Sequence, residues 1–248
     1  MSKTIVITGG SRGIGAAAAR LAGVRGWSVA LNYARNDEAA KASVAAVEAA
    51  GGRAIALKGN AGNETDVAML FDAASKAFGP IDGVVNNAGI VGPAMPLAEM
   101  EVARMRAIIE LNVLGALIVA REAARRMAKS RGGRGGVLVN LSSFGAKLGA
   151  PNEYVDYAAS KGAIESLTIG LSKELGREGV RVNAVRPGLI ETDIHASSGD
   201  PGRAERLGGA TPLGRAGTAD EVAEAIVWLL SDQAAYVSGA ILDVTGGR

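Results

Sequence analysis

The sequence predicts an α/β protein with a single doubly wound domain, in which a seven-stranded, mostly parallel sheet has helices on both faces. Three observations indicate this class. Short apolar, β-branched segments alternate along the chain with longer, alanine-rich segments. A glycine-rich turn directly follows the first apolar segment. No linker or repeat divides the 248 residues, so we expect one domain over residues 1–248.

The alternation places each element in order. Strands are expected near residues 3–8, 27–33, 53–58, 81–86, 136–141, 180–185 and 239–243. Helices are expected between them, over residues 13–25, 36–50, 64–78, 100–129, 154–178 and 218–231. A run of glycines at 132–136 fits a helix-to-strand turn.

One segment, residues 193–217, is less regular and is rich in Gly, Ser, Pro and Arg. Ligands of doubly wound sheets bind at the carboxyl ends of the strands, so we predict that this segment closes over a substrate. A plain surface loop is the alternative. The only histidine, His195, lies here and is expected to be a substrate-loop or surface residue rather than a catalyst.

Composition argues against several other functions. The net charge is only +2, from 27 basic and 25 acidic residues, which does not describe a nucleic-acid surface. The basic run between Arg121 and Arg134 is interpreted as a solvated helix end. No apolar run is long enough to span a bilayer and no cysteine is present, so we expect a cytoplasmic protein without a membrane partner. One histidine and no cysteine leave too few ligands for a catalytic zinc, so no metal site is expected.

The turn after the first strand runs from Thr8 to Gly15 and opens the first helix. Strand, glycine-rich turn and helix form the Rossmann βαβ arrangement, which presents backbone N–H groups and a helix N-terminus to a phosphate. The spacing is T-G-x-x-x-G-x-G rather than the more frequent G-x-G-x-x-G. We therefore predict a dinucleotide pyrophosphate at Gly9, Ser11, Arg12, Gly13, Ile14 and Gly15.

The same turn contains a second pattern. Residues 9–13 match G-x-S-x-G, the nucleophile elbow of α/β-hydrolases, with Ser11 as the nucleophile. His195 follows in the chain, so the residue order of a triad is possible. An elbow serine normally lies deeper in the sheet sequence, whereas only ten residues precede Ser11. A serine hydrolase is therefore kept as a remote alternative.

Tyr157 and Lys161 lie four residues apart in a predicted helix, downstream of Ser142 and Ser143. Positions i and i+4 share one helix face. A phenol ordinarily has a pKa of ~10, and an ammonium ~4 Å away would lower that pKa by about 3 at an effective dielectric of ~20. We therefore predict that Lys161 brings Tyr157 into the range of general acid–base catalysis, with Ser143 holding a substrate oxygen.

Read together, these motifs resemble the short-chain dehydrogenase/reductase superfamily of classical type, over essentially the whole chain. Within it, the chain is most similar to 3-oxoacyl carrier-protein reductases and glucose-dehydrogenase-like members. Between Ser143 and Tyr157 there is one residue more than in the commonest spacing of the superfamily. The matching motifs are the turn at 8–15, Asn86-Asn87-Ala88-Gly89, Asn112, the set Ser143, Tyr157 and Lys161, and Arg186-Pro187-Gly188 followed by Thr192.

The resemblance implies catalytic and structural roles for two asparagines. Asn112, inside the long predicted helix, would distort that helix and hold a water that links Lys161 to solvent. Asn86 would contact the adenosine side, in a run that forms the floor of the cofactor cleft and stabilises the sheet. Ser143 is a better match to the family serine than Ser142.

The resemblance also implies further cofactor contacts. Lys161 would bind the nicotinamide ribose, and Thr192 would bind the carboxamide. Asn60 stands where many relatives carry an aspartate near the adenine, which leaves that contact open. The other residues placed against the cofactor are Ala88, Gly89, Tyr157, Pro187, Gly188 and Ile190.

The end of the second predicted strand favours NADP(H). An NAD site usually places an acid there to hold the ribose 2′-hydroxyl, but no acid occurs between Trp27 and Asn36, and Tyr33 stands in its place. Arg12 and Arg35 are instead suited to a 2′-phosphate. Asp37 comes later and is expected at a helix start.

These patterns predict an NADP(H)-dependent oxidoreductase that transfers a hydride between nicotinamide and a carbonyl or secondary alcohol, with Tyr157 as general acid/base. The substrate is a small molecule, and no nucleic-acid partner is expected. A catalytically silent dinucleotide-binding sensor or scaffold is the alternative. The apolar stretch 236–244 lies at the predicted edge of the sheet, and an exposed edge of this kind needs to be covered. The resemblance implies that two chains pair such edges and that long helices form a second interface, so a homotetramer is expected.

Overall fold

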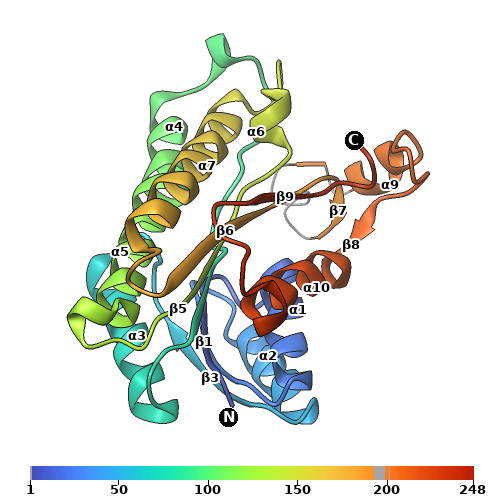
Figure 1. Cartoon of the computed structure of the whole chain (residues 1–248). Coiled ribbons are helices and arrows are strands. Elements are labelled where there is room, and N and C mark those ends of the chain that lie inside the picture. The colour runs from blue at the N-terminus through green and yellow to red at the C-terminus, as the bar shows by residue number, and fades with distance from the viewer. Residues whose placement is uncertain (1, 193–198, 201) are drawn as a thin grey trace.

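A seven-stranded parallel sheet forms the centre of the molecule (Figure 1). The computed structural model describes residues 2–192, 199–200 and 202–248. The strand order is β3-β2-β1-β4-β5-β6-β9, and all six pairings are parallel. The strands are β1 (Thr4–Ile7), β2 (Ser28–Tyr33), β3 (Arg53–Lys58), β4 (Gly83–Asn86), β5 (Gly136–Leu141), β6 (Val180–Pro187) and β9 (Ile241–Val244). The seven predicted strands are confirmed, and the sheet is wholly rather than mostly parallel.

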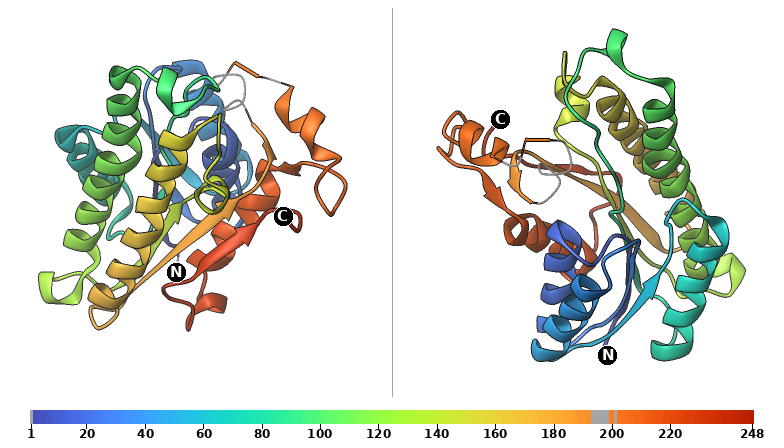
Figure 2. Two further views of the ribbon diagram at one scale, coloured as in Figure 1. Left: turned by 90° about the horizontal axis from the view of Figure 1, so that it is seen from above. Right: turned by 180° about the vertical axis from the view of Figure 1, so that it is seen from behind.

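Helices cover both faces of the sheet (Figures 1 and 2). One face packs against α1 (Gly13–Val24), α2 (Asp37–Ala49) and α10 (Ala219–Leu230). The other face packs against α3 (Glu64–Phe78), α5 (Ala116–Met127) and α7 (Val155–Leu175). Successive strand residues enter opposite cores, as Ile5 and Val6 do. Because both faces are covered, the strands are continuous apolar runs in the sequence.

The region predicted as one helix over 100–129 consists of three helical segments. These are α4 (Val102–Ile109), a π-helical segment η2 (Glu110–Gly115) and α5. A π segment is rare and is often found at functional sites. Asn112 lies within it, so the expected distortion of the helix around this residue is confirmed.

The less regular region contains short elements. Before it lies β7 (Ile190–Glu191), which pairs with β8 (Gly217–Thr218), and within it lies α9 (Arg203–Gly208). Residues 193–198 and 201, and with them His195, lie outside the described residues. The remaining short elements are η1 (Leu97–Glu99), η3 (Lys129–Arg131), α6 (Gly145–Leu148) and η4 (Asp232–Ala234).

Side-chain caps fix the starts of several helices. Asn36 caps α2 by accepting a hydrogen bond from Ala39 N at 2.9 Å, and Thr218 with Glu221 forms a capping box at α10. Asp37 is therefore the first helical residue of α2, as expected. Within the part of the chain that the structure describes, no helix has the length and hydrophobicity of a membrane span.

Candidate active site

The predicted site residues meet at the carboxyl edge of the sheet, where β1, β4, β5 and β6 end. The surroundings of two glycines show how close the predicted motifs lie to one another. A Cβ placed on Gly89 would lie 3.2 Å from Asn112 Oδ1 and 3.5 Å from Lys161 Nζ. A Cβ placed on Gly13 would lie 3.5 Å from Thr192 Cγ2. Segments from five parts of the sequence therefore lie together at the edge where doubly wound sheets bind ligands.

Three polar residues hold the glycine-rich turn in place. Thr8 Oγ1 accepts hydrogen bonds from the main-chain nitrogens of Asn87 and Ala88, each at 3.0 Å. Asn87 Nδ2 donates to Thr8 O at 2.8 Å and to Gly9 O at 3.1 Å. Asn32 Oδ1 accepts from Gly9 N at 3.0 Å. The roles of Thr8, Asn32 and Asn87 were not predicted, although a polar residue at the end of a buried strand is a signal for them.

The turn fits the phosphates of a dinucleotide. A Cβ on Gly15 would lie 2.4 Å from Gly9 O, and a Cβ on Gly10 would lie 2.6 Å from Leu31 Cβ, so only glycine allows this close approach. Arg12, the cap residue of α1, makes no side-chain hydrogen bond to the first turn. The N–H groups at the start of α1 are therefore available to an anion.

Two arginines beside this turn have free guanidinium groups. Arg12 and Arg35 are exposed, and neither forms an ion pair or side-chain hydrogen bond with another described residue. Asp37, by contrast, is paired with Lys58, whose Nζ lies 3.0 Å from the carboxylate, and Tyr33 also acts on this carboxylate. Lys58 and Tyr33 hold the pKa of Asp37 below its usual range. Among the described residues, this side of the site therefore offers two cations without a partner and an acid that is already paired.

The side chains of Tyr157 and Ser143 lie side by side, because a Cβ placed on Gly145 would lie 3.3 Å from Ser143 Oγ and 3.8 Å from Tyr157 Cε1. Ser143 Oγ accepts a hydrogen bond from Gly145 N at 3.1 Å. Ser142 Oγ is engaged elsewhere, because it donates to Glu165 Oε1 at 2.7 Å. Despite the additional residue in the intervening sequence, it is Ser143 that contacts Tyr157.

Lys161 departs from the predicted arrangement. Its Nζ donates to Leu141 O at 2.8 Å and lies 5.6 Å from the centroid of the Tyr157 ring. Burial raises the pKa of Tyr157, and the nearby Ser143 hydroxyl only partly opposes this effect. Burial also lowers the pKa of Lys161 to about 8. The expectation that the pKa of Tyr157 lies below its ordinary value is therefore wrong for this geometry, in which desolvation outweighs the effect of a more distant charge.

Asn112 connects the π segment to the loop after β4. Its Oδ1 accepts from Ile90 N at 2.8 Å, and its Nδ2 donates to Ile90 O at 2.9 Å and to Ser160 Oγ at 3.1 Å. Ser160 immediately precedes Lys161 and donates to Tyr157 O at 2.7 Å. The side chain of Asn112 thus ties η2, the loop at Ile90 and helix α7 together.

Two asparagines that were predicted to contact the cofactor form hydrogen bonds with neighbouring protein groups. Asn86 is 5% exposed, and its Nδ2 donates to Ala116 O and Asn140 Oδ1, each at 3.0 Å. We therefore assign this side chain to stabilising the sheet, and a contact with adenosine stays a prediction. Asn60 is exposed and its Oδ1 accepts from Gly62 N at 2.9 Å, so its contact also stays a prediction.

Other predicted residues lie along the same edge. Pro187 O accepts from Phe144 N at 2.8 Å, which joins β6 to the segment that carries Ser143. Gly188 N donates to Val244 O at 2.9 Å. Ile190 is buried at the start of β7. Among the described residues, none forms a hydrogen bond with the Ser11 hydroxyl, and His195 lies outside them.

An ion network that was not predicted lies directly behind Ser142. Both oxygens of Glu165 accept from Arg186, at 2.8 Å each, and Arg186 Nη1 donates to Asp243 at 2.6 Å. Glu165 is four residues after Lys161 on α7. The network therefore joins α7 to β6 and β9 beneath the site.

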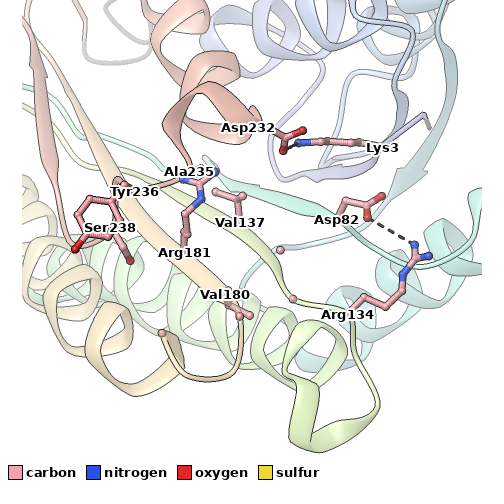
Figure 3. A pocket seen from close by; sticks show the side chains of 14 residues that line it. Lys3, Asp82, Arg134, Val137, Val180, Arg181, Asp232, Ala235, Tyr236 and Ser238 are labelled. Carbon is pink, nitrogen blue, oxygen red and sulfur yellow. Dashed lines mark hydrogen bonds and ion pairs between the residues drawn. The ribbon is translucent and has the colours of Figure 1, made fainter.

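A cavity of about 820 Å³ lies at the opposite edge of the sheet (Figure 3). Its lining includes residues at the amino ends of strands, such as Lys3, Gly136 and Val180. Four of its charged side chains form two ion pairs, with Lys3 2.8 Å from Asp232 and Arg134 3.6 Å from Asp82, and Arg181 donates to main-chain carbonyls. None of the predicted site residues lines it, and we do not assign it to the candidate active site.

The buried ammonium of Lys161 should make the protein less stable at neutral pH than a Lys161→Met variant. Burial lowers the pKa of this group from 10.5 to about 8. Between these values the unfolded chain binds the proton and the folded chain does not, so stability rises with pH. Below pH 8 the whole cost of burying the charged ammonium, about 3 kcal/mol, lowers the free energy of unfolding of the wild type. The Lys161→Met variant avoids this cost, but it loses the hydrogen bond to Leu141 O, which offsets ~1 kcal/mol of its gain in stability.

Urea unfolding at pH 7 and at pH 9.5 measures this effect. Lys161→Met is expected to unfold at a higher midpoint at pH 7, with a difference of ~2 kcal/mol that shrinks at pH 9.5. Greater stability of the wild type at both pH values would contradict a lowered pKa.

Comparison with known proteins places the chain in a family. A family model described as enoyl-(acyl carrier protein) reductase matches residues 9–248. The chain belongs to the short-chain dehydrogenase/reductase superfamily. An uncharacterised oxidoreductase of Escherichia coli is 47% identical over 243 residues, which are 98% of this chain and 98% of that protein. Members of this superfamily bind a nicotinamide cofactor, which agrees with the geometry of the turn.

Two solved structures of short-chain dehydrogenases are similar over nearly the whole chain. One, from Burkholderia cenocepacia in complex with NADP, is 33% identical with a TM-score of 0.88, covering 99% of this chain and 97% of that one. The other, a 3-ketoacyl-(acyl-carrier-protein) reductase from Brucella melitensis complexed with NADH, is 30% identical with a TM-score of 0.90, covering 99% and 98%. Both cofactors thus occur among similar proteins.

Proposed function

We propose that this short-chain dehydrogenase/reductase is an NADP(H)-dependent oxidoreductase that transfers a hydride between nicotinamide and a carbonyl or secondary alcohol. The observation that carries the proposal is that the side chains of Tyr157 and Ser143 lie side by side, next to the buried Lys161 and at the same sheet edge as the glycine-rich turn. A protein that only senses a dinucleotide needs no such arrangement of two hydroxyls and an ammonium.

The bound nicotinamide supplies or accepts the hydride. The hydroxyls of Ser143 and Tyr157 hold the substrate oxygen, and Tyr157 gives it a proton in the reductive direction. Burial raises the pKa of Tyr157, which keeps the phenol protonated at neutral pH, as a proton donor must be. Lys161, with a pKa of about 8, is charged below that pH and favours the phenolate that remains after proton transfer.

Asn112 takes a supporting role in this proposal. It fixes the main chain at Ile90 and contacts Ser160, so it holds the loop after β4 against the helix that carries Tyr157 and Lys161. A water held near Lys161 for proton exchange, as the resemblance implies, would lie in this region. Thr192, beside Gly13, is proposed to bind the carboxamide.

Loss of NADPH absorbance in the presence of carbonyl compounds tests the proposed reaction. A panel of acetoacetyl thioesters, ketoses, steroid ketones and small diketones is expected to contain at least one substrate. If NADPH binds but no compound is reduced, and no alcohol is oxidised with NADP⁺, the sensor alternative is favoured. Labelling of Ser11 by an organophosphonate probe would instead favour the hydrolase alternative.

We propose a homotetramer as the assembled form, in the cytoplasm. Two separate apolar surfaces support two different interfaces, which is what a dimer of dimers needs. One surface lies on α4, η2, α5 and α7, and its exposed residues are Val102, Ile109, Leu114, Leu117 and Ile169. The other lies around the unpaired edge of β9, with Trp228 and the fully exposed Tyr236 nearby.

Light scattering at micromolar concentration is expected to give a mass of four chains. Leu117→Lys, on the first surface, should reduce the particle to a dimer by placing a charge in an apolar interface. A monodisperse monomer of the wild type would contradict the proposed assembly.

A further inference from the structure

A bidentate ion pair attaches α9 to the segment that leads into α7. Arg203 is the first residue of α9, and Glu153 precedes the first residue of α7 by two positions. Arg203 Nη1 and Nη2 donate to the two carboxylate oxygens of Glu153, at 2.9 Å and 2.6 Å. The side chains are only 17% and 38% exposed, so this pair is shielded more than an ordinary surface ion pair.

Tyr154 lies under this ion pair. The guanidinium carbon of Arg203 is 5.3 Å from the centroid of the Tyr154 ring, which is a cation–π distance. Tyr154 is 7% exposed, and among the described residues its hydroxyl is the only buried side-chain polar atom without a hydrogen-bond partner. A buried hydroxyl that has lost water without gaining a partner destabilises the state in which it is buried.

The same segment also holds the loop that follows β4. Met95 N donates to Glu153 O at 3.1 Å. Just before Glu153, Ala150 and Asn152 adopt left-handed φ values of 45° and 60°, so the turn is imposed by its surroundings. Three segments beside the candidate site therefore meet at Glu153 and Tyr154: the loop after β4, the entry into α7 and helix α9.

We propose that Glu153 and Arg203 form a latch that holds α9 against the segment leading into α7, and that the Tyr154 hydroxyl weakens the latched state so that α9 can be released. The ion pair and the cation–π contact favour the latched state. Release of Arg203 uncovers the ring, so water can reach the hydroxyl. The two contributions oppose each other, which is the condition for a segment that opens and closes during turnover. One part of this inference, that α9 covers the substrate, rests on the proposed function.

Hydrogen exchange of residues 202–210, measured without substrate or cofactor, tests the latch. α9 has six residues, which is too short for a helix to persist once it is detached, so its amides exchange when the latch opens. Glu153→Gln is expected to accelerate exchange about tenfold, because it removes the charge but keeps the main-chain contact with Met95. Tyr154→Phe is expected to slow exchange five- to tenfold, because the latched state no longer buries an unpaired hydroxyl.

Arg206→Gln is the matched control. Arg206 lies on α9 and pairs with Asp200, an ion pair that does not reach α7. Its removal should leave exchange in the rest of α9 unchanged. Effects of the same sign in Glu153→Gln and Tyr154→Phe, or no effect in either, would overturn the latch.

Steady-state kinetics on the substrate found in the carbonyl panel provide a second measurement. Glu153→Gln should raise KM several-fold, since the closed form is less populated. Tyr154→Phe should lower KM and kcat together, since release is slower. A Tyr154→Phe variant with a raised KM and unchanged exchange would show that the hydroxyl binds substrate, and would overturn the proposed role. The exchange experiment needs no turnover, so a failure of the proposed enzymatic function is distinguishable from a failure of the latch.

Discussion

Tyr157→Phe is expected to lower kcat for carbonyl reduction by ~10²–10⁴ while NADPH still binds with nearly unchanged affinity. The substitution keeps the ring and removes only the hydroxyl that contacts Ser143 and would protonate the substrate oxygen. Steady-state kinetics with NADPH and a reduced carbonyl compound give kcat, and fluorescence titration gives the dissociation constant of NADPH.

The matched control is Tyr236→Phe, because Tyr236 is fully exposed and lies on the loop before β9. It should leave kcat unchanged. If Tyr157→Phe retained near-normal kcat, the assignment of the proton donor would be wrong, and the Ser143 hydroxyl would be the next candidate. Loss of NADPH binding in Tyr157→Phe would instead point to a damaged site.

NADPH should be preferred over NADH in kcat/KM by at least ten- to a hundredfold. A 2′-phosphate carries about two negative charges near neutral pH. Arg12 and Arg35 are both free to donate charge-assisted hydrogen bonds, each worth roughly 1.5–3 kcal/mol, and ~1.4 kcal/mol corresponds to a factor of ten. Arg35→Ala is therefore expected to lose much of the preference, with NADH kinetics nearly unchanged.

Tyr33→Asp should move the preference further, toward NADH. The new carboxylate would repel a 2′-phosphate and accept a hydrogen bond from a ribose hydroxyl. Asp37, whose pKa Tyr33 helps to lower in the wild type, would add to the repulsion. Arg25→Ala, at the other end of α1, is the control and should change neither cofactor constant. A wild-type preference for NADH would contradict the interpretation of this strand end.

The fold was predictable because its physical causes are local in the sequence. Strands that are buried on both faces are continuous apolar runs in the sequence. The glycine-rich turn from Gly9 to Gly15 indicates the first βαβ unit. Even the distortion at Asn112 was expected, although only through resemblance to a family.

The electrostatics of the site were not predictable from spacing. A spacing of four positions puts Tyr157 and Lys161 on one helix face, but spacing alone gives neither the distance between the phenol and the ammonium nor a measure of their desolvation. In the structure Lys161 Nζ binds Leu141 O, and burial raises the pKa of the phenol. The hydrogen bonds that hold the glycine-rich turn were also not predicted, because they join residues that are far apart in the sequence: Asn87 binds Thr8 across 79 positions.

The position of β9 has a consequence for the synthesis of the chain. β9 pairs with β6 from Ala184 to Pro187, and Asp243 binds Arg186 across 57 positions of sequence. During translation, β6 and the residues behind Ser142 therefore lack this partner until β9 has left the ribosome. In that period one edge of the strand is unpaired, and such chains aggregate or need a chaperone. Removal of residues 241–244 should therefore abolish the yield of folded protein.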